Sequence, residues 1–141
     1  MQTQVKNELE YYQWFLNIEK QRCIRNKRIV CILSIDFNQN GNPLIRKNKG
    51  RIIKLIQSYV RQSDAIFNFD EKVHIILTDT DKEGAYLVAK RILNGVQKKC
   101  LSDGHFILNV KIWDFNAKIQ FKTFMYNQGW SEPWRLIATH K

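Results

Sequence analysis

One short apolar run constrains the fold of this chain more than any other feature. Residues Arg28 to Phe37 form an almost unbroken, β-branched segment, in which Ile29 to Leu33 are all apolar and Ile35 follows. A strand that is apolar at successive rather than alternate positions is covered on both faces. The run therefore predicts a central strand. It is much shorter than the roughly 18 residues of a membrane-spanning helix, so we expect no membrane span and a cytoplasmic protein.

Apolar spacing and turn residues predict an α/β (α+β) arrangement around this strand. Val5, Leu9, Tyr12 and Leu16 recur at helical spacing and indicate a first helix over residues 4 to 24. Five further elements are expected: a helix over 48 to 61, strands over 65 to 69 and 73 to 77, a helix that begins near Thr80 or Asp81, and a strand over 106 to 115.

The resulting order, a helix followed by β-α-β-β-α-β, is that of ferredoxin-like and palm-type domains, in which helices cover one face of an antiparallel sheet. With 141 residues, the chain has the length of one domain. Its core is expected over about residues 5 to 115. The remaining tail, 116 to 141, predicts an extra edge strand beginning at Lys118 and then a cover rich in aromatic residues.

The charge is strongly basic and local. The chain has 23 basic and 13 acidic residues, for a net charge of +10. Two blocks carry much of the excess: Lys20, Arg22, Arg25, Lys27 and Arg28 in the first, and Arg46, Lys47, Lys49, Arg51 and Lys54 in the second. Such blocks attract nucleic acid, phosphates or an acidic protein surface, although solvated helix faces of a basic protein have the same composition.

No residue pattern points to a metal or cofactor. Cys23, Cys31 and Cys100 share no ligand spacing and lie in or beside apolar or helical patterns, which is typical of buried free thiols. The three histidines, His74, His105 and His140, have no partner at ligand or catalytic-triad spacing. We expect no cofactor and no metal site.

The first helix carries more aromatic residues than one face can bury. Tyr11, Tyr12, Trp14 and Phe15 occupy four of five successive positions. Residues two apart point to different sides of a helix. At least one of these side chains is therefore expected to be exposed, unless another chain or the aromatic tail covers it.

Three segments resemble the GGDEF family of diguanylate cyclases in order and spacing: Ile32–Phe37 (ILSIDF), Tyr59–Asp64 (YVRQSD) and Leu77–Ile92 (LTDTDKEGAYLVAKRI). The resemblance covers roughly residues 5 to 115. It implies the palm-type fold and a chemistry in which divalent metal, held by acidic residues on the first strand and in the hairpin, joins two GTP molecules.

The positions that the resemblance assigns to catalysis have diverged. Ser34 stands where the family has a metal-binding aspartate, and Arg51 stands where it has an acidic residue that opens the next helix. The glycine-rich hairpin is replaced by Phe69–Val73, with Asp70, Glu71 and Lys72 as its turn. Glycines there allow the backbone to approach the phosphates, which these side chains would obstruct. We therefore expect no cyclase activity.

The resemblance also implies a ligand site outside the catalytic hairpin. In the family, an Arg-x-x-Asp motif binds cyclic di-GMP, and here this motif is Arg61 and Asp64, with Arg91 on the next helix completing the site. A guanidinium can bind guanine and phosphate bidentately, and a carboxylate can accept from guanine amines. The alternative is that Arg61 is only a cation at a helix C-terminus and Asp64 only a turn former.

Together these features predict a catalytically inactive GGDEF-like domain that acts by binding. The ligand implied is cyclic di-GMP, and a homodimer is left open. One alternative is a regulatory subunit that binds nucleic acid or an acidic protein through Lys20, Arg22, Arg25, Arg28, Arg46, Lys47, Lys49 and Arg51, with no nucleotide ligand. Another is a subunit that only docks on a larger partner.

Overall fold

In the computed structural model, the structure describes residues 7–37, 43–100, 107–116, 118–125, 129–130 and 135–139. The helices are α1 (Glu8–Asn26), α2 (Pro43–Lys47), α3 (Lys49–Tyr59) and α4 (Lys82–Cys100). The strands are β1 (Ile29–Asp36), β2 (Ala65–Phe69), β3 (Lys72–Leu77), β4 (Ile107–Asp114), β5 (Lys118–Met125), β6 (Gly129–Trp130) and β7 (Arg135–Thr139).

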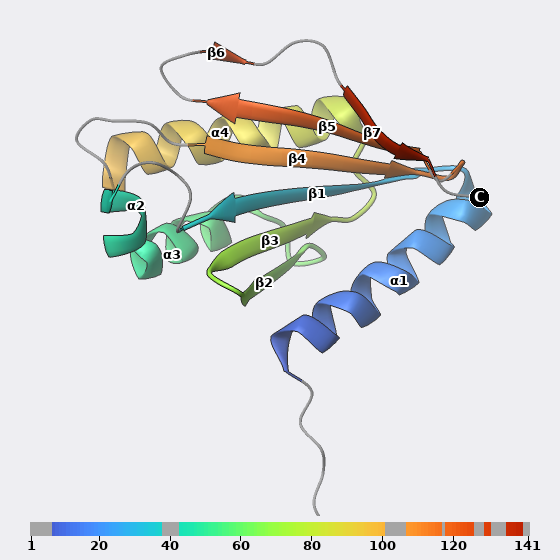
Figure 1. Ribbon diagram of the computed structural model, residues 1–141, viewed down its shortest axis with the longest axis horizontal. Helices are drawn as coiled ribbons and strands as arrows, with labels where there is room; N and C mark the ends of the chain where they lie inside the picture. The colour runs from blue at the N-terminus through green and yellow to red at the C-terminus, as the bar shows by residue number, and fades with distance from the viewer. Residues whose placement is uncertain are drawn as a thin grey trace, which may run out of the picture.

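The strands form one antiparallel sheet, and its first four strands have the predicted topology. Their order is β2-β3-β1-β4, followed by β5 and β6 (Figure 1). Strand β1 lies inside the sheet between β3 and β4, as its apolar run predicts. The α/β (α+β) class and the β-α-β-β-α-β order are therefore confirmed. Among the helices that the structure describes, none combines the length and apolar character of a transmembrane segment.

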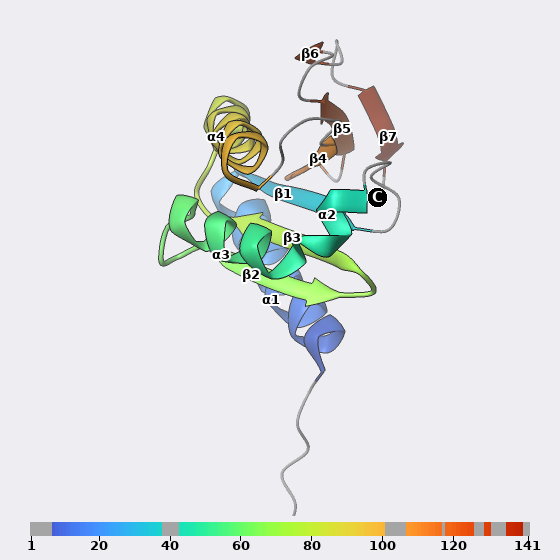
Figure 2. The same cartoon turned by 90° about the vertical axis from the view of Figure 1, so that its left-hand side faces the viewer.

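Helices cover both faces of the sheet. Cys31, Leu33 and Ile35 of β1 join the larger core with α3 and α4, which lie side by side in Figure 2. The alternate residues Val30 and Ile32 join a second, smaller core that includes α1. A run of apolar residues is needed in β1 because each of its faces is buried against a different helix layer.

Several element boundaries differ from the prediction. The short helix α2 was not expected, since its residues follow the glycine and asparagine of a predicted loop. Lys72 belongs to β3 and not to the turn, which consists of Asp70 and Glu71 alone. These two residues have φ values of 53° and 57°. A two-residue hairpin turn with positive φ at both positions is of type I′, which glycine and asparagine favour.

The C-terminal segment extends the sheet. Strand β5 pairs with β4, so the predicted strand at Lys118 is confirmed, but it is not an edge strand. Strands β6 and β7 both pair with the outer side of β5. Strand β6 pairs at Phe124 and Met125, and β7 pairs along Lys118 to Phe121. The predicted aromatic cover lies outside the residues whose side chains the structure describes.

Candidate ligand-binding site

Arg61 and Asp64 lie in the turn that joins α3 to β2, and they bond to each other. The Asp64 carboxylate accepts from the Arg61 backbone N–H at 2.9 Å and from the guanidinium at 3.2 Å. The Asp64 side chain is 2% exposed, whereas that of Arg61 is 55% exposed. The carboxylate is therefore enclosed in the protein, and the arginine lies at the surface above it.

The same pair fixes the loop between β3 and α4. Asp64 accepts from the Thr78 backbone N–H at 3.0 Å, and the Arg61 guanidinium donates to the Thr78 carbonyl and to the Thr80 hydroxyl. From the sheet side, the Cys31 thiol donates to the Thr80 carbonyl with an Sγ to O distance of 3.2 Å. Two separate segments of the chain, the α3–β2 turn and β1, thus bond to this loop.

Cys31 contributes to this site as a structural group. Its side chain is fully buried, and burial, together with the nearby Asp81 carboxylate, raises the pKa of its thiol to about 12. The thiol is therefore protonated at neutral pH and available as a donor. All three cysteines are free, and Cys23 and Cys31 are buried as predicted, while Cys100 is half-buried.

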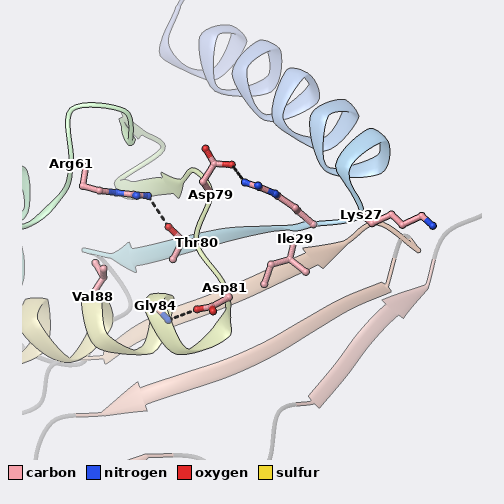
Figure 3. A pocket seen from close by; sticks show the side chains of 9 residues that line it. Lys27, Ile29, Arg61, Asp79, Thr80, Asp81, Gly84 and Val88 are labelled. Carbon is pink, nitrogen blue, oxygen red and sulfur yellow. Dashed lines mark hydrogen bonds and ion pairs between the residues drawn. The ribbon is translucent and has the colours of Figure 1, made fainter.

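Beside this loop is a pocket of about 640 Å³ (Figure 3). The C-terminal end of α1, the start of β1, the α3–β2 turn and the first turns of α4 surround it. Its lining residues are Lys27, Arg28, Ile29, Arg61, Asp79, Thr80, Asp81, Gly84 and Val88. Volumes of this order hold small-molecule ligands in other proteins.

Three cations and two carboxylates contribute to the electrostatics of the pocket. Asp79 bonds to Arg28 at 2.5 Å and lies 3.8 Å from Arg22, so its charge is largely compensated. Asp81 caps α4 by accepting from the Gly84 N–H at 2.8 Å. Lys27 and Arg61 also line the pocket, Arg61 while paired with Asp64. The positive N-terminal end of α4, where an anionic group is favoured, is capped by the Asp81 carboxylate.

The structure brings together two of the three predicted site residues. Arg61 and Asp64 are in contact, but only Arg61 lines the pocket, and the oxygens of Asp64 accept from Arg61 and Thr78. Arg91 is exposed on α4 and does not line the pocket. Sequence analysis placed Lys27 and Arg28 in a basic block but gave no signal that they line one pocket with Arg61.

The turn of the β2–β3 hairpin lies at the opposite end of β1 from this pocket (Figure 1). There the Glu71 carboxylate lies 3.4 Å from the Lys49 ammonium group, and the Phe37 N–H donates to the Glu71 carbonyl at 2.9 Å. On β1, Ser34 and Asp36 point to the same face, as the two-residue period requires. Of the two acidic side chains of the turn, that of Glu71 is thus paired with a lysine.

The two basic blocks do not form one surface. The first lies at the C-terminal end of α1 and the second on α2 and α3, at opposite ends of β1 (Figure 1). Several members are paired with other groups of the chain at the surface: Arg22 with Glu19, Arg28 with Asp79, and Arg51 with the Lys99 carbonyl. This arrangement does not favour a single extended groove that binds nucleic acid.

His74 is packed between aromatic rings on the α1 face of the sheet. Its ring stacks on Phe69 with centroids 4.7 Å apart, and the Tyr12 ring lies 4.8 Å away. Burial and the nearby Lys72 and Lys111 lower its pKa to about 4. Within the described ranges, no group of three or more histidine, cysteine, aspartate or glutamate side chains is gathered as a metal site requires.

No protein-family model matches this sequence, and no curated protein matches it either. The GGDEF resemblance therefore stays a prediction from the three short segments that carry it.

Proposed function

We propose that this chain is a noncatalytic, GGDEF-like regulatory domain that binds a phosphate-bearing nucleotide, of the cyclic di-GMP class, in the pocket beside Arg61. The observation that carries the proposal is the pocket itself. It is lined by the arginine of the Arg-x-x-Asp motif, by Lys27 and Arg28 after α1, and by the first turn of α4. Cationic side chains and a helix N-terminus together are suited to phosphate oxygens.

In this proposal Asp64 is a positioning residue. Its carboxylate is enclosed and holds the guanidinium of Arg61, whose exposed edge is the part that a ligand can reach. Arg28 is a second candidate for direct contact, because its guanidinium pairs with the exposed Asp79 carboxylate. A ligand phosphate could compete with that carboxylate for the Arg28 guanidinium, since exposed ion pairs are weak.

We also propose that the chain has no cyclase activity. This is supported by Ser34 in place of a carboxylate and by the Glu71 side chain, which is paired with Lys49 at the hairpin. Incubation with GTP and Mg²⁺ or Mn²⁺, followed by chromatography of the nucleotides, tests it. Formation of cyclic di-GMP by the pure protein would overturn it.

Calorimetry with cyclic di-GMP, cyclic di-AMP and GTP tests binding. Replacing Arg61 alone is ambiguous because Arg61 also holds the β3–α4 loop, so the informative variant is Arg28→Ala, which leaves the Arg61–Asp64 pair in place. It should weaken binding about tenfold or more, as expected for one lost charge-assisted contact. Arg46→Ala, an exposed arginine at the other end of the sheet, is the matched control.

Two results would overturn the binding proposal. One is the absence of heat with every nucleotide for the unmutated protein. The other is equal weakening by Arg28→Ala and Arg46→Ala, because a nonspecific basic surface would respond equally to both. Binding of a short oligonucleotide that falls steeply with added salt would instead favour the nucleic-acid alternative. Arg91→Ala tests the family-type site, since Arg91 does not line the pocket.

A further inference from the structure

One carboxylate of the pocket lies between two arginines at the C-terminal end of α1. The Oδ1 atom of Asp79 lies 2.5 Å from the Arg28 guanidinium (Figure 3), and its Oδ2 atom lies 3.8 Å from that of Arg22. The side chains of Arg28 and Asp79 are both about half exposed, and both residues line the pocket. The carboxylate is therefore paired with a cation that a ligand phosphate would also use.

The backbone of the β3–α4 loop is held by the neighbours of Asp79. Thr78 bonds to Asp64 and Arg61, and Asp81 caps α4. In the part of the chain that the structure describes, the Asp79 carboxylate accepts from no backbone N–H and pairs with guanidinium groups alone. The carboxylate can therefore leave its arginines without undoing the bonds that hold the loop.

The backbone conformation at this position does not require a negative charge. Asp79 has a φ of 49°, in the left-handed region. Glycine, asparagine and aspartate are the residues that enter this region most readily. A neutral asparagine would fit the loop as well as aspartate does. The particular contribution of aspartate here is a negative charge beside two arginines.

We propose that Asp79 is a built-in competitor of the nucleotide, an inference that rests on the nucleotide site proposed above. Its carboxylate occupies the Arg28 guanidinium in the free protein and gives it up when a ligand phosphate binds. Exposed ion pairs are weak, so a phosphate group can displace the carboxylate, but the broken pair subtracts from the binding free energy. The displaced carboxylate also repels the phosphate beside it. Asp79 thus lowers the affinity of the pocket for phosphate-bearing ligands.

Calorimetry with cyclic di-GMP at physiological salt compares the unmutated protein with Asp79→Asn and Asp79→Gly. Both variants remove the carboxylate and keep a residue that accepts a positive φ. Each should bind the nucleotide about threefold more tightly or better, because the competing ion pair and the repulsion are gone. Circular dichroism shows whether each variant is folded as the unmutated protein is.

The matched control is Glu83→Gln. Glu83 is an exposed carboxylate in the first turn of α4 that does not line the pocket. The variant removes the same charge from the same end of the helix. Because salt screens exposed charges that touch no ligand group, it should change the affinity by less than about twofold.

A double-mutant cycle tests whether Asp79 acts through Arg28. In the Arg28→Ala background the contested guanidinium is absent, so Asp79→Asn should lose most of its effect on affinity. A gain as large as in the unmutated background would overturn the proposal, because Asp79 would then act only as a nearby charge.

Two further results separate the competitor role from the nucleotide site itself. If the unmutated protein binds a nucleotide and Asp79→Asn binds it no more tightly than Glu83→Gln does, only the competitor role is wrong. If neither the unmutated protein nor Asp79→Asn binds cyclic di-GMP, cyclic di-AMP or GTP, both proposals are wrong. Binding by Asp79→Asn alone would support both.

Discussion

The Arg61 guanidinium lies 3.2 Å from the Asp64 carboxylate, and this carboxylate also accepts from the Thr78 backbone N–H. Arg61 and Asp64, which the sequence analysis assigned to a ligand site, thus also link the α3–β2 turn to the β3–α4 loop. A motif of this kind can serve both purposes, because the buried acid holds the arginine while the arginine keeps half of its surface exposed.

This arrangement predicts unequal stability losses on mutation. Asp64→Ala should lower the free energy of unfolding by about 2 to 3 kcal/mol, since it leaves the buried Thr78 N–H without its acceptor. Arg61→Ala should cost only about 1 kcal/mol, because the guanidinium is half exposed. Urea denaturation measures both. A larger loss for Arg61→Ala than for Asp64→Ala would contradict the structural role assigned to the carboxylate.

Gly95 on α4 is predicted to tolerate no side chain. A Cβ atom at this position would come within 2.7 Å of Cε2 of Tyr59, which packs across from α3. Gly95→Ala should therefore destabilise the protein by about 1 to 3 kcal/mol through overpacking.

The matched control is Gly50→Ala in α3, where a Cβ atom has nothing within 4 Å. This change should stabilise the protein by about 0.5 to 1 kcal/mol, because alanine has the higher helix propensity. Thermal denaturation of the two variants should thus give shifts of opposite sign. Equal shifts would show that α3 and α4 are not packed as the structure has them.

A substitution in the β2–β3 hairpin turn is predicted to increase the stability of the protein. Asp70 has a φ of 53°, in the left-handed region that glycine adopts without a Cβ penalty. Asp70→Gly should raise the free energy of unfolding by about 0.5 to 1 kcal/mol, and Asp70→Val should lower it. Glu71→Gly relieves the same strain but also removes the ion pair with Lys49, so its effect should be smaller. Chemical denaturation ranks the three variants, and destabilisation by Asp70→Gly would exclude a type I′ turn.

His74 predicts a pH dependence of stability. Its pKa falls from 6.5 to about 4 on folding, because burial and nearby lysines disfavour the charged ring. Between these two values the unfolded chain binds the proton and the folded protein does not, so stability should fall as the pH is lowered from 6.5 towards 4. NMR titration should show the His74 ring still neutral at pH 5.5. His74→Gln should reduce the slope of stability against pH in this window, and an unchanged slope would contradict the lowered pKa.

The sequence alone predicted the course of the backbone well where the periodic pattern was strong. The uninterrupted apolar run at Ile29–Leu33 identified the inner strand, and helical spacing identified α1, α3 and α4. It failed at α2 and at the exact turn of the hairpin, because short elements have too few residues for a period to emerge and a non-glycine type I′ turn has no local signal.

The C-terminal strands and the pocket show what the sequence left open. Strand β5 was visible as an alternating segment, but its inner position depends on β6 and β7, which pair with it through backbone groups that side-chain patterns do not report. Lys27 and Arg28 line the same pocket as Arg61 only because α1 ends beside the β3–α4 loop. The position of this helix end depends on how helices are placed on the sheet, which is decided by long-range packing.

The amino-acid sequence by itself determined the fold class, the order of the central elements, the basic charge and the lack of glycine in Phe69–Val73, because each of these depends on local composition and spacing. Only the tertiary structure decided that Asp64 is enclosed, that Arg91 does not line the pocket, and that Tyr11 and Trp14 are the aromatic residues of α1 left most exposed. These are contacts between segments distant in the chain, and they are fixed by the packing of both faces of one sheet against different helices.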